Sequence, residues 1–214
     1  MFTLILVFTI HHLCQDRPSS VGLIGILMEP NYLCRQFTKT PLIASLQGLG
    51  RRSIQGDSAW SRWGLNLGFS ASYEAEGLVI RGLPSRPTHA LELDLKDTPD
   101  LTQPIVAGGL LMRREVKLTG LETLNGKEIP RLDALKEALG QLGVQVSDSG
   151  PASIAFDAKG WSAQETPLSV DAQDDHRMAF FWALVGLEQP IALASEACVA
   201  KSYPHFWSNW RTYE

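Results

Sequence analysis

Apolar and polar residues follow two different periods along the chain from residue 91 onward. Segments 91–95 and 116–119 alternate apolar and polar positions, which is typical of a half-buried strand. Within 131–142 the leucines recur every three or four residues, so they lie on one face of a predicted helix, and Gly143 supplies its stop. The two periods therefore predict a succession of strands and helices.

These patterns combine into one unit with the order βαβαββ. Its predicted elements are a strand at 91–95, a helix at 101–112, a strand at 116–119, a helix at 131–142 and strands at 144–147 and 153–156. That order indicates an α/β domain in which helices pack on a sheet. A second, incomplete unit follows, with predicted strands at 168–170 and 191–194 and predicted helices at 177–187 and 203–210.

The first ninety residues are less regular. The pattern predicts a strand at 42–46, a helix at 58–67 and a strand at 78–80, and the loop 84–87 is a candidate domain boundary. Residues 1–40 show no clear period and are left unassigned, as non-native or disordered sequence. The apolar run 1–10 lacks a basic start and a small-residue cleavage site and is too short to span a bilayer, so a buried strand is favoured over a signal peptide.

Composition excludes several classes of protein. Of 214 residues, 44% are hydrophobic and 20% are charged, as in ordinary globular domains. The formal net charge of -4 offers no electrostatic footprint for nucleic acid. Cys14, Cys34 and Cys198 are widely spaced and suggest neither a disulfide framework nor a metal site, so a reducing, cytoplasmic setting is expected.

Charged residues gather at the predicted element ends between residues 97 and 131, where an α/β scaffold usually displays its chemistry. Pro99 disfavours the helical conformation for Thr98, and Asp100 is then expected to cap a helix that begins at residue 101. Pro130 stands where the first turn of the next helix would begin. The ionisable residues therefore mark loops and not element interiors.

Two further polar clusters stand at loop-to-helix junctions in the last third of the chain. Asp174 and Asp175 are expected to be helix caps. Arg177 falls in the first turn, where the helix dipole favours acids, so it is expected to have an anionic partner in the protein or in a ligand. Lys201 precedes another predicted helix.

Four cations and two carboxylates thus become the candidate site. They are Lys127, Arg131, Arg177 and Lys201, together with Asp100 and Glu128. If they converge, they suit a small, highly anionic substrate that undergoes proton transfer. The alternative is that each is a solvated surface charge, which is the commoner situation for any single one.

At these residues the chain resembles the 5-enolpyruvylshikimate-3-phosphate synthase family over about residues 42–210. The matching stretches, in the family's order, are Ser53-Ile54-Gln55-Gly56-Asp57, Pro99-Asp100, Lys127-Glu128 with Arg131, Asp175-His176-Arg177-Met178-Ala179, and Lys201-Ser202-Tyr203-Pro204 with Phe206. The related UDP-N-acetylglucosamine enolpyruvyl transferase shares the fold, but the fourth and fifth stretches favour the shikimate enzyme.

The resemblance implies a fold and a domain plan. The fold is the α/β enolpyruvyl transferase architecture, an inside-out α/β barrel of βαβαββ repeats, here incomplete. Residues 41–86 would be a remnant of the last unit of the N-terminal domain, and 87–214 the C-terminal phosphoenolpyruvate-binding domain.

The resemblance also implies a reaction in the shikimate pathway. The family joins phosphoenolpyruvate to shikimate 3-phosphate and releases phosphate, with no metal and no organic cofactor. Asp100 would accept the proton of the attacking ring hydroxyl, and Glu128 would donate one to the methylene carbon of phosphoenolpyruvate. Lys127 would contact shikimate 3-phosphate, while phosphoenolpyruvate would be held by Arg131, Arg177 and Lys201. No nucleic acid or membrane partner is expected.

The chain departs from the family in three respects. Families of this type usually have Ser or Thr and then Asp where Ile129-Pro130 stands, and the lost acid is a lost helix cap. Thr123 stands where asparagine is frequent. The family enzyme is also about twice as long, so the chain would need a missing N-terminal half or self-association, and the alternative is an inactive remnant that at most binds small anions.

Overall fold

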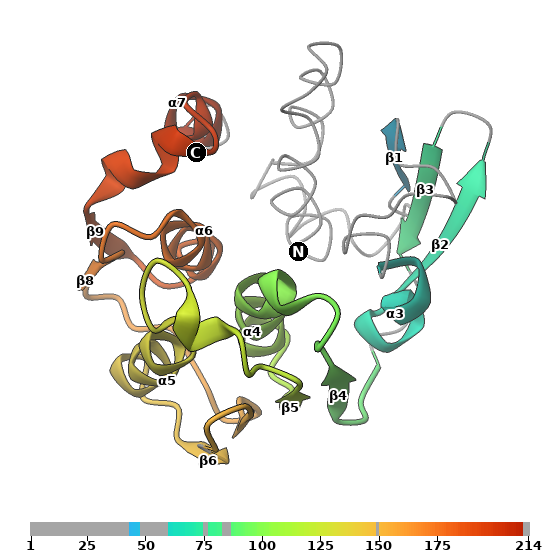
Figure 1. Cartoon of the computed structure of the whole chain (residues 1–214), viewed down its shortest axis with the longest axis horizontal. Coiled ribbons are helices and arrows are strands. Elements are labelled where there is room, and N and C mark those ends of the chain that lie inside the picture. The colour runs from blue at the N-terminus through green and yellow to red at the C-terminus, as the bar shows by residue number, and fades with distance from the viewer. Residues whose placement is uncertain (1–42, 48–59, 75–76, 83–86, 149, 212–214) are drawn as a thin grey trace. The chain divides into compact units, whose positions relative to one another are not determined.

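The computed structural model describes residues 43–47, 60–74, 77–82, 87–148 and 150–211 (Figure 1). Contacts between residues divide the chain into two units. One comprises Thr88–Pro204, and the other comprises residues 1–87 together with 205–214. All six residues of the candidate site belong to the unit 88–204.

A four-stranded sheet forms one layer of the unit 88–204. Its strands are β4 (Leu91–Asp94), β5 (Glu115–Thr119), β6 (Val146–Asp148) and β7 (Ile154–Asp157), in the order β4-β5-β7-β6. β4 and β5 are parallel, whereas β7 runs antiparallel to both β5 and β6. Apolar residues of β4, β5 and β7 are buried and the alternating charged residues are exposed, so one face of this sheet carries the core.

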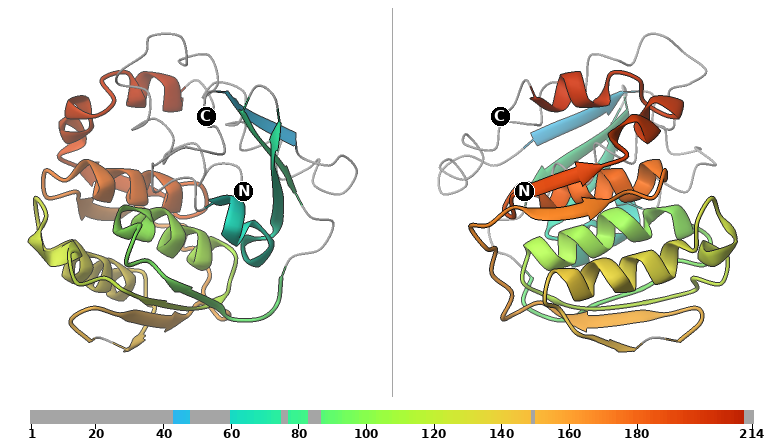
Figure 2. Two further views of the ribbon diagram at one scale, coloured as in Figure 1. Left: turned by 45° about the vertical axis from the view of Figure 1, so that its right-hand side comes forward. Right: turned by 90° about the vertical axis from the view of Figure 1, so that its left-hand side faces the viewer.

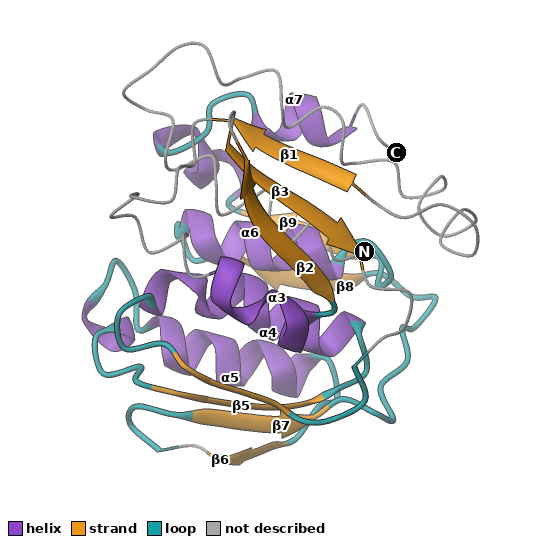
Figure 3. Ribbon diagram, turned by 90° about the vertical axis from the view of Figure 1, so that its right-hand side faces the viewer, coloured by secondary structure: helices purple, strands orange, loops and turns teal. Residues whose placement is uncertain are grey.

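Helices α4 (Thr102–Leu111) and α5 (Arg131–Gln141) lie against that buried face (Figure 3). α4 is apolar on all sides and buried along almost its whole length, as expected for a helix enclosed between other elements. Gly109 allows α4 to approach β5 closely, because a side-chain carbon there would overlap Val116. α5 instead buries the face that carries its leucines and exposes the opposite, polar face, as its sequence period predicts.

The second, smaller part of this unit consists of β8 (Leu168–Asp171), α6 (His176–Val185) and β9 (Ile191–Ala194). β8 and β9 are parallel, with α6 as the crossover between them. α6 packs against α4 and also contacts α5, so the three helices lie side by side (Figures 1 and 2). Short 3-10 helices stand next to them at Pro99–Leu101 (η4), Leu124–Gly126 (η5) and Glu196–Lys201 (η6).

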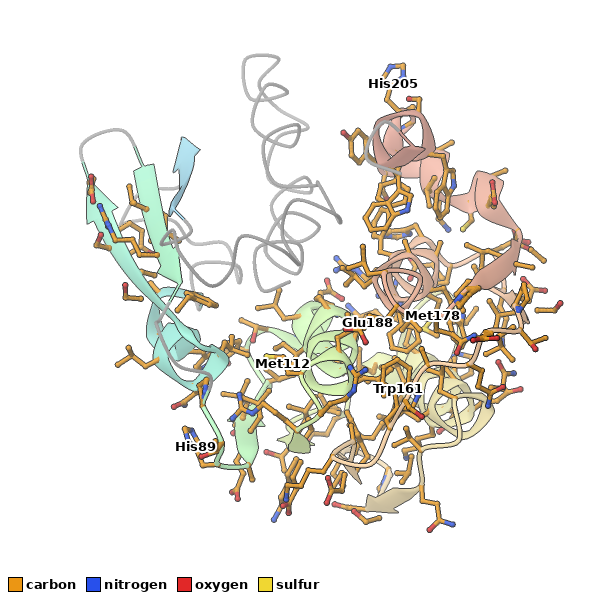
Figure 4. All side chains as sticks on the ribbon, turned by 180° about the vertical axis from the view of Figure 1, so that it is seen from behind. His89, Met112, Trp161, Met178, Glu188 and His205 are labelled. Carbon is orange, nitrogen blue, oxygen red and sulfur yellow. The ribbon has the colours of Figure 1, made fainter. Side chains whose placement is uncertain are left out.

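Side chains join α4, α5 and α6 at their carboxyl ends. Arg113, just after α4, forms a 2.5 Å ion pair with Glu188, just after α6. Its guanidinium lies 4.5 Å from the centre of the Trp161 ring, whose indole N–H donates to the carbonyl of Leu142 at the end of α5. Glu188 and Trp161 are both labelled in this region of Figure 4. The carboxyl ends of the three helices are therefore held by one connected set of contacts.

The other unit contains an antiparallel sheet of β1 (Ile43–Gln47), β3 (Gly77–Gly82) and β2 (Phe69–Glu74), in that order. Helix α3 (Trp60–Leu67) contacts β2, and α7 (Phe206–Arg211) belongs to the same unit. Sequence analysis predicted β1, β3 and α3 but overlooked β2, although Phe69, Ala71 and Tyr73 alternate with polar residues there as in a half-buried strand.

One prediction about the start of α4 is wrong. Asp100 was expected to cap a helix beginning at residue 101, but it lies inside η4, and α4 begins at Thr102 without a side-chain cap. The carboxylate of Asp100 is instead engaged by cations from other elements. A residue in the middle of a 3-10 turn presents its side chain outward and not to the helix amides, and this leaves Asp100 available for that pairing.

Three sequence assignments fall wholly or mostly outside the described residues. These are the unassigned region 1–40, the stretch Ser53-Ile54-Gln55-Gly56-Asp57 and the candidate domain boundary at 84–87. Within the described ranges, no helix combines the length and the apolar composition that crossing a membrane requires.

The close approach of α4 to β5 predicts opposite effects for two glycine substitutions. Gly109→Ala should lower the free energy of unfolding by about 1–3 kcal/mol, because the new methyl group overlaps the fully buried Val116. Gly140→Ala on α5 has no atom within 4 Å of the new carbon and should raise stability by about 0.5–1 kcal/mol. Urea denaturation measures the free energy of unfolding of both variants. Equal changes in this free energy for Gly109→Ala and Gly140→Ala would contradict the close packing of α4 on β5.

Candidate active site at the amino ends of three helices

Arg131 is the centre of the candidate site. It is the first residue of α5, and only 2% of its side chain is exposed. Its Nε donates to Asp175 Oδ2 at 2.8 Å, its Nη1 lies 3.3 Å from Asp100 Oδ1, and its Nη2 pairs with Glu128. One guanidinium thereby connects carboxylates from three separate segments, a geometry that a lysine ammonium could not reproduce.

Asp175 joins Arg131 to the start of α6. Its carboxylate is fully buried, and Oδ1 accepts hydrogen bonds from the backbone N–H groups of Arg177 (2.8 Å) and Met178 (3.0 Å). The expected cap is thus confirmed for Asp175, whereas Asp174 is exposed and does not cap the helix. Sequence reasoning missed the second task of Asp175, which is to hold Arg131.

Asp100 lies among three cations. Lys127 Nζ is 3.7 Å from Oδ1, and Arg131 pairs with the same oxygen. Arg177 Nη2 lies 3.1 Å from Oδ2, and its Nη1 donates to the Asp100 carbonyl at 2.9 Å. The anionic partner expected for Arg177 is therefore Asp100, a residue 77 positions away in the chain.

Glu128 and Lys201 complete the set. Glu128 is about half exposed, and a hydrogen bond from its own backbone N–H lowers its pKa, as do the nearby charges of Arg131 and Lys201, against the effect of partial burial. Lys201 Nζ donates to the carbonyl of Asp174 at 3.0 Å. All six predicted residues thus gather around the amino ends of α4, α5 and α6.

His176 also lies in this cluster, although sequence analysis gave it no role. Burial lowers its pKa from 6.5 to about 4, and the charges of Arg177, Arg131 and Lys201 act in the same direction, while Asp175 opposes them. The imidazole is therefore neutral near pH 7. A histidine next to the capping aspartate was the available signal, but its burial could not be inferred from the sequence.

The electrostatics of this arrangement favour small anions. Three helix amino ends contribute partial positive charge, and the four cationic side chains outnumber the three carboxylates that face them by one. Two carboxylates that are partly exposed, Asp100 and Glu128, stand within the same cluster and can exchange protons with a bound molecule. Among the described residues, no group of three or more His, Cys, Asp and Glu side chains could hold a metal ion.

Comparison with known proteins shows which family the chain matches. The family model described as EPSP synthase (3-phosphoshikimate 1-carboxyvinyltransferase) matches residues 42–210. A 3-phosphoshikimate 1-carboxyvinyltransferase of Bacteroides fragilis is 32% identical over 167 residues, which cover 78% of this chain and 40% of that protein. The same enzyme of Methanospirillum hungatei is 26% identical over 209 residues, covering 96% of this chain and 47% of that protein.

A solved structure shares the fold. EPSP synthase from Acinetobacter baumannii superposes with a TM-score of 0.63 at 18% identity, over 81% of this chain and 41% of that one. The predicted α/β enolpyruvyl transferase architecture is thereby confirmed. The chain spans less than half the length of these relatives.

The buried pair of Arg131 and Asp175 leads to a stability prediction. Arg131→Met should lower the free energy of unfolding by about 3 kcal/mol or more, because it leaves the carboxylate of Asp175 buried without a cation. The double variant Arg131→Met with Asp175→Asn should lose less free energy of unfolding than Arg131→Met alone. Asparagine keeps the oxygen that caps α6 but carries no buried charge. Urea denaturation tests this. The exposed pair of Lys159 and Glu115 is the control, and Lys159→Met should leave the free energy of unfolding nearly unchanged.

The low pKa of His176 predicts a pH dependence of stability. The folded chain resists protonation of this imidazole, whereas the unfolded chain protonates near pH 6.5, so stability should fall as the pH drops from 6.5 towards 4. In His176→Gln the fall over this interval should be shallower. Thermal denaturation at a series of pH values measures it, and identical profiles for the two chains would refute the assignment.

Proposed function

Since the chain belongs to the EPSP synthase family, we propose that it supplies the C-terminal half of an enolpyruvyl transfer site in the shikimate pathway. The reaction transfers the carboxyvinyl group of phosphoenolpyruvate to shikimate 3-phosphate and releases phosphate. The observation that carries this proposal is a network of ion pairs at the amino ends of α4, α5 and α6. In it Lys127, Arg131 and Arg177 surround the carboxylate of Asp100. Arg131 also pairs with Glu128.

The cations of the cluster bind the substrates in this proposal. Arg131, Arg177 and Lys201 hold the carboxylate and phosphate of phosphoenolpyruvate, and Lys127 contacts shikimate 3-phosphate. Guanidinium groups suit this task because their two N–H edges match the oxygens of a carboxylate or a phosphate. In the free chain Asp100 pairs with both arginines, so an incoming anion replaces this carboxylate as their partner.

The two carboxylates transfer protons. Asp100 accepts the proton of the ring hydroxyl that attacks phosphoenolpyruvate, and Glu128 donates a proton to its methylene carbon. The free chain favours the ionised form of Glu128, whose pKa is lowered, so a donor must first be protonated. Substrate that binds Arg131 removes the ionic partner of Glu128, and this raises the pKa of the carboxyl towards the value a donor needs.

The domain plan and location follow the family. Residues 87–214 act as the C-terminal phosphoenolpyruvate-binding domain, and 41–86 are the last unit of the N-terminal domain. The reaction takes place in the cytoplasm. The matched region covers 40–47% of its relatives, and an N-terminal half of the family enzyme, or a second copy of this chain, completes the site.

The cation cluster by itself supports a second candidate function, which is binding of small anions without turnover. A chain without the facing half still has the cation cluster, and it would bind phosphoenolpyruvate or phosphate without turnover. Closure of a site contributes several kcal/mol of barrier lowering through positioning and exclusion of water, and an open half lacks that contribution. Binding without phosphate release distinguishes this candidate from the transferase.

The test is phosphate release by the purified chain with phosphoenolpyruvate and shikimate 3-phosphate, accompanied by calorimetric binding of each substrate. We expect release that requires both substrates and falls by at least about 100-fold in Asp100→Asn, which keeps the shape of the side chain but cannot accept the proton. Lys159→Ala, at an exposed position in the turn after β7 and outside the cluster, is the matched control and should leave release unchanged.

The outcomes separate the two functions. Binding of phosphoenolpyruvate without release assigns the chain to the anion-binding remnant. Absence of both binding and release, in a chain whose circular dichroism shows a folded α/β domain, would overturn both functions.

A further inference from the structure

The start of α5 lacks a cap of its own. Pro130 occupies the cap position, and its backbone angles are φ −66° and ψ 79°. Proline has no side-chain oxygen, and no side chain at this position bonds the first helical amides. Yet the next residue is Arg131, whose guanidinium has to meet three carboxylates at fixed points.

Asn125 supplies the missing cap from outside the helix. Its Oδ1 accepts hydrogen bonds from the backbone N–H groups of Leu132 (3.0 Å) and Asp133 (3.4 Å). These are the second and third helical amides, which a capping side chain normally bonds. The Nδ2 of Asn125 also donates to Asp133 Oδ2 at 3.1 Å, so the amide group is fixed in orientation.

The contact closes a loop that carries half of the candidate site. Asn125 belongs to η5, which is anchored by the fully buried Leu124. Lys127, Glu128 and Arg131 all lie between Asn125 and its partner Leu132. A hydrogen bond across the two ends of this loop restricts the conformations of all three site residues.

We propose that Asn125 is a positioning residue of the site. It replaces the cap that Pro130 cannot provide, and it holds the loop so that Arg131 engages Asp175 and Asp100. Its consequence for phosphoenolpyruvate rests on the proposed function, but its effect on Arg131 does not. A local cap of an exposed helix end, without influence on Arg131, is the rival explanation.

Two readouts distinguish these explanations in the full-length chain. The first is solvent exchange of the Arg131 Nε proton, observed by nuclear magnetic resonance and assigned from its absence in Arg131→Lys. This proton is protected by the bond to buried Asp175 and reports the position of the guanidinium directly. The second is the dissociation constant of phosphoenolpyruvate.

Asn125→Ala should accelerate exchange of that proton and raise the dissociation constant, each by about fivefold, which corresponds to the loss of one helix cap. Adding Pro130→Asp should restore both quantities, because an aspartate at the cap position bonds the same amides. Pro130→Asp alone should change neither. Glu122→Ala, an exposed residue of the same segment, is the matched control and should also change neither.

Each outcome has one meaning. Unchanged exchange in Asn125→Ala overturns the positioning role, and so does faster exchange that Pro130→Asp fails to restore. If exchange follows the expected pattern but the unaltered chain binds no phosphoenolpyruvate, the positioning role stands and the proposed function fails. If both quantities change and recover together, Asn125 positions Arg131 for its ligand.

Discussion

The site depends on one buried ion pair, between Arg131 and Asp175. Removing two charges from water is costly, and such a pair is tolerated only when hydrogen bonds satisfy both groups. Here Asp175 accepts two backbone amides as well as the guanidinium, and Arg131 has a carboxylate at each of its three nitrogens. The pair therefore fixes the amino ends of α5 and α6 relative to each other, and the remaining charges are arranged around it.

The topology explains why the helix amino ends meet. β4 leads into α4, β5 into α5 and β8 into α6, and each helix returns along the face of its sheet. The segments that follow these strands come from two sheets, and the ion pairs of Arg131 with Asp100 and Asp175 show that they meet at the amino ends of the helices. Ligands of α/β folds commonly bind at the carboxyl ends of the strands. The contacts of Arg113, Trp161 and Glu188 hold the opposite ends of the same helices. Contacts between side chains therefore connect these helices at both their amino and their carboxyl ends, and the site lies at the amino ends.

The free site is already close to electrical balance. The two arginines and Lys127 face Asp100, Glu128 and Asp175, and Lys201 bonds a backbone carbonyl. Lys127 and the two arginines are thus already paired with carboxylates, and an anion that binds one of these cations replaces a carboxylate as its partner. Binding an anion therefore changes the charges around Asp100 and Glu128, so anion affinity and proton transfer by these carboxylates are coupled.

The limits of prediction are visible in particular residues. The leucine period of 131–142 predicted α5 to within one residue of its end, and the alternation in 116–119 predicted β5, because both signals are local. β2 carries the same local alternation in Phe69, Ala71 and Tyr73, and this strand was overlooked although its signal was present. Asp100 was assigned to capping, since a 3-10 turn that begins at Pro99 cannot be distinguished by pattern from the first turn of a helix.

The sequence by itself determined the α/β class, most of the elements of the unit 88–204 and the residue types of the site, through periodicity and through family resemblance. Only the tertiary structure decided that Arg131 is the centre, that Asp175 holds it and that Asn125 caps α5 in place of Pro130. Hydrogen bonds and ion pairs between residues as much as 77 positions apart depend on how the helices pack, and no local period in the chain records that packing.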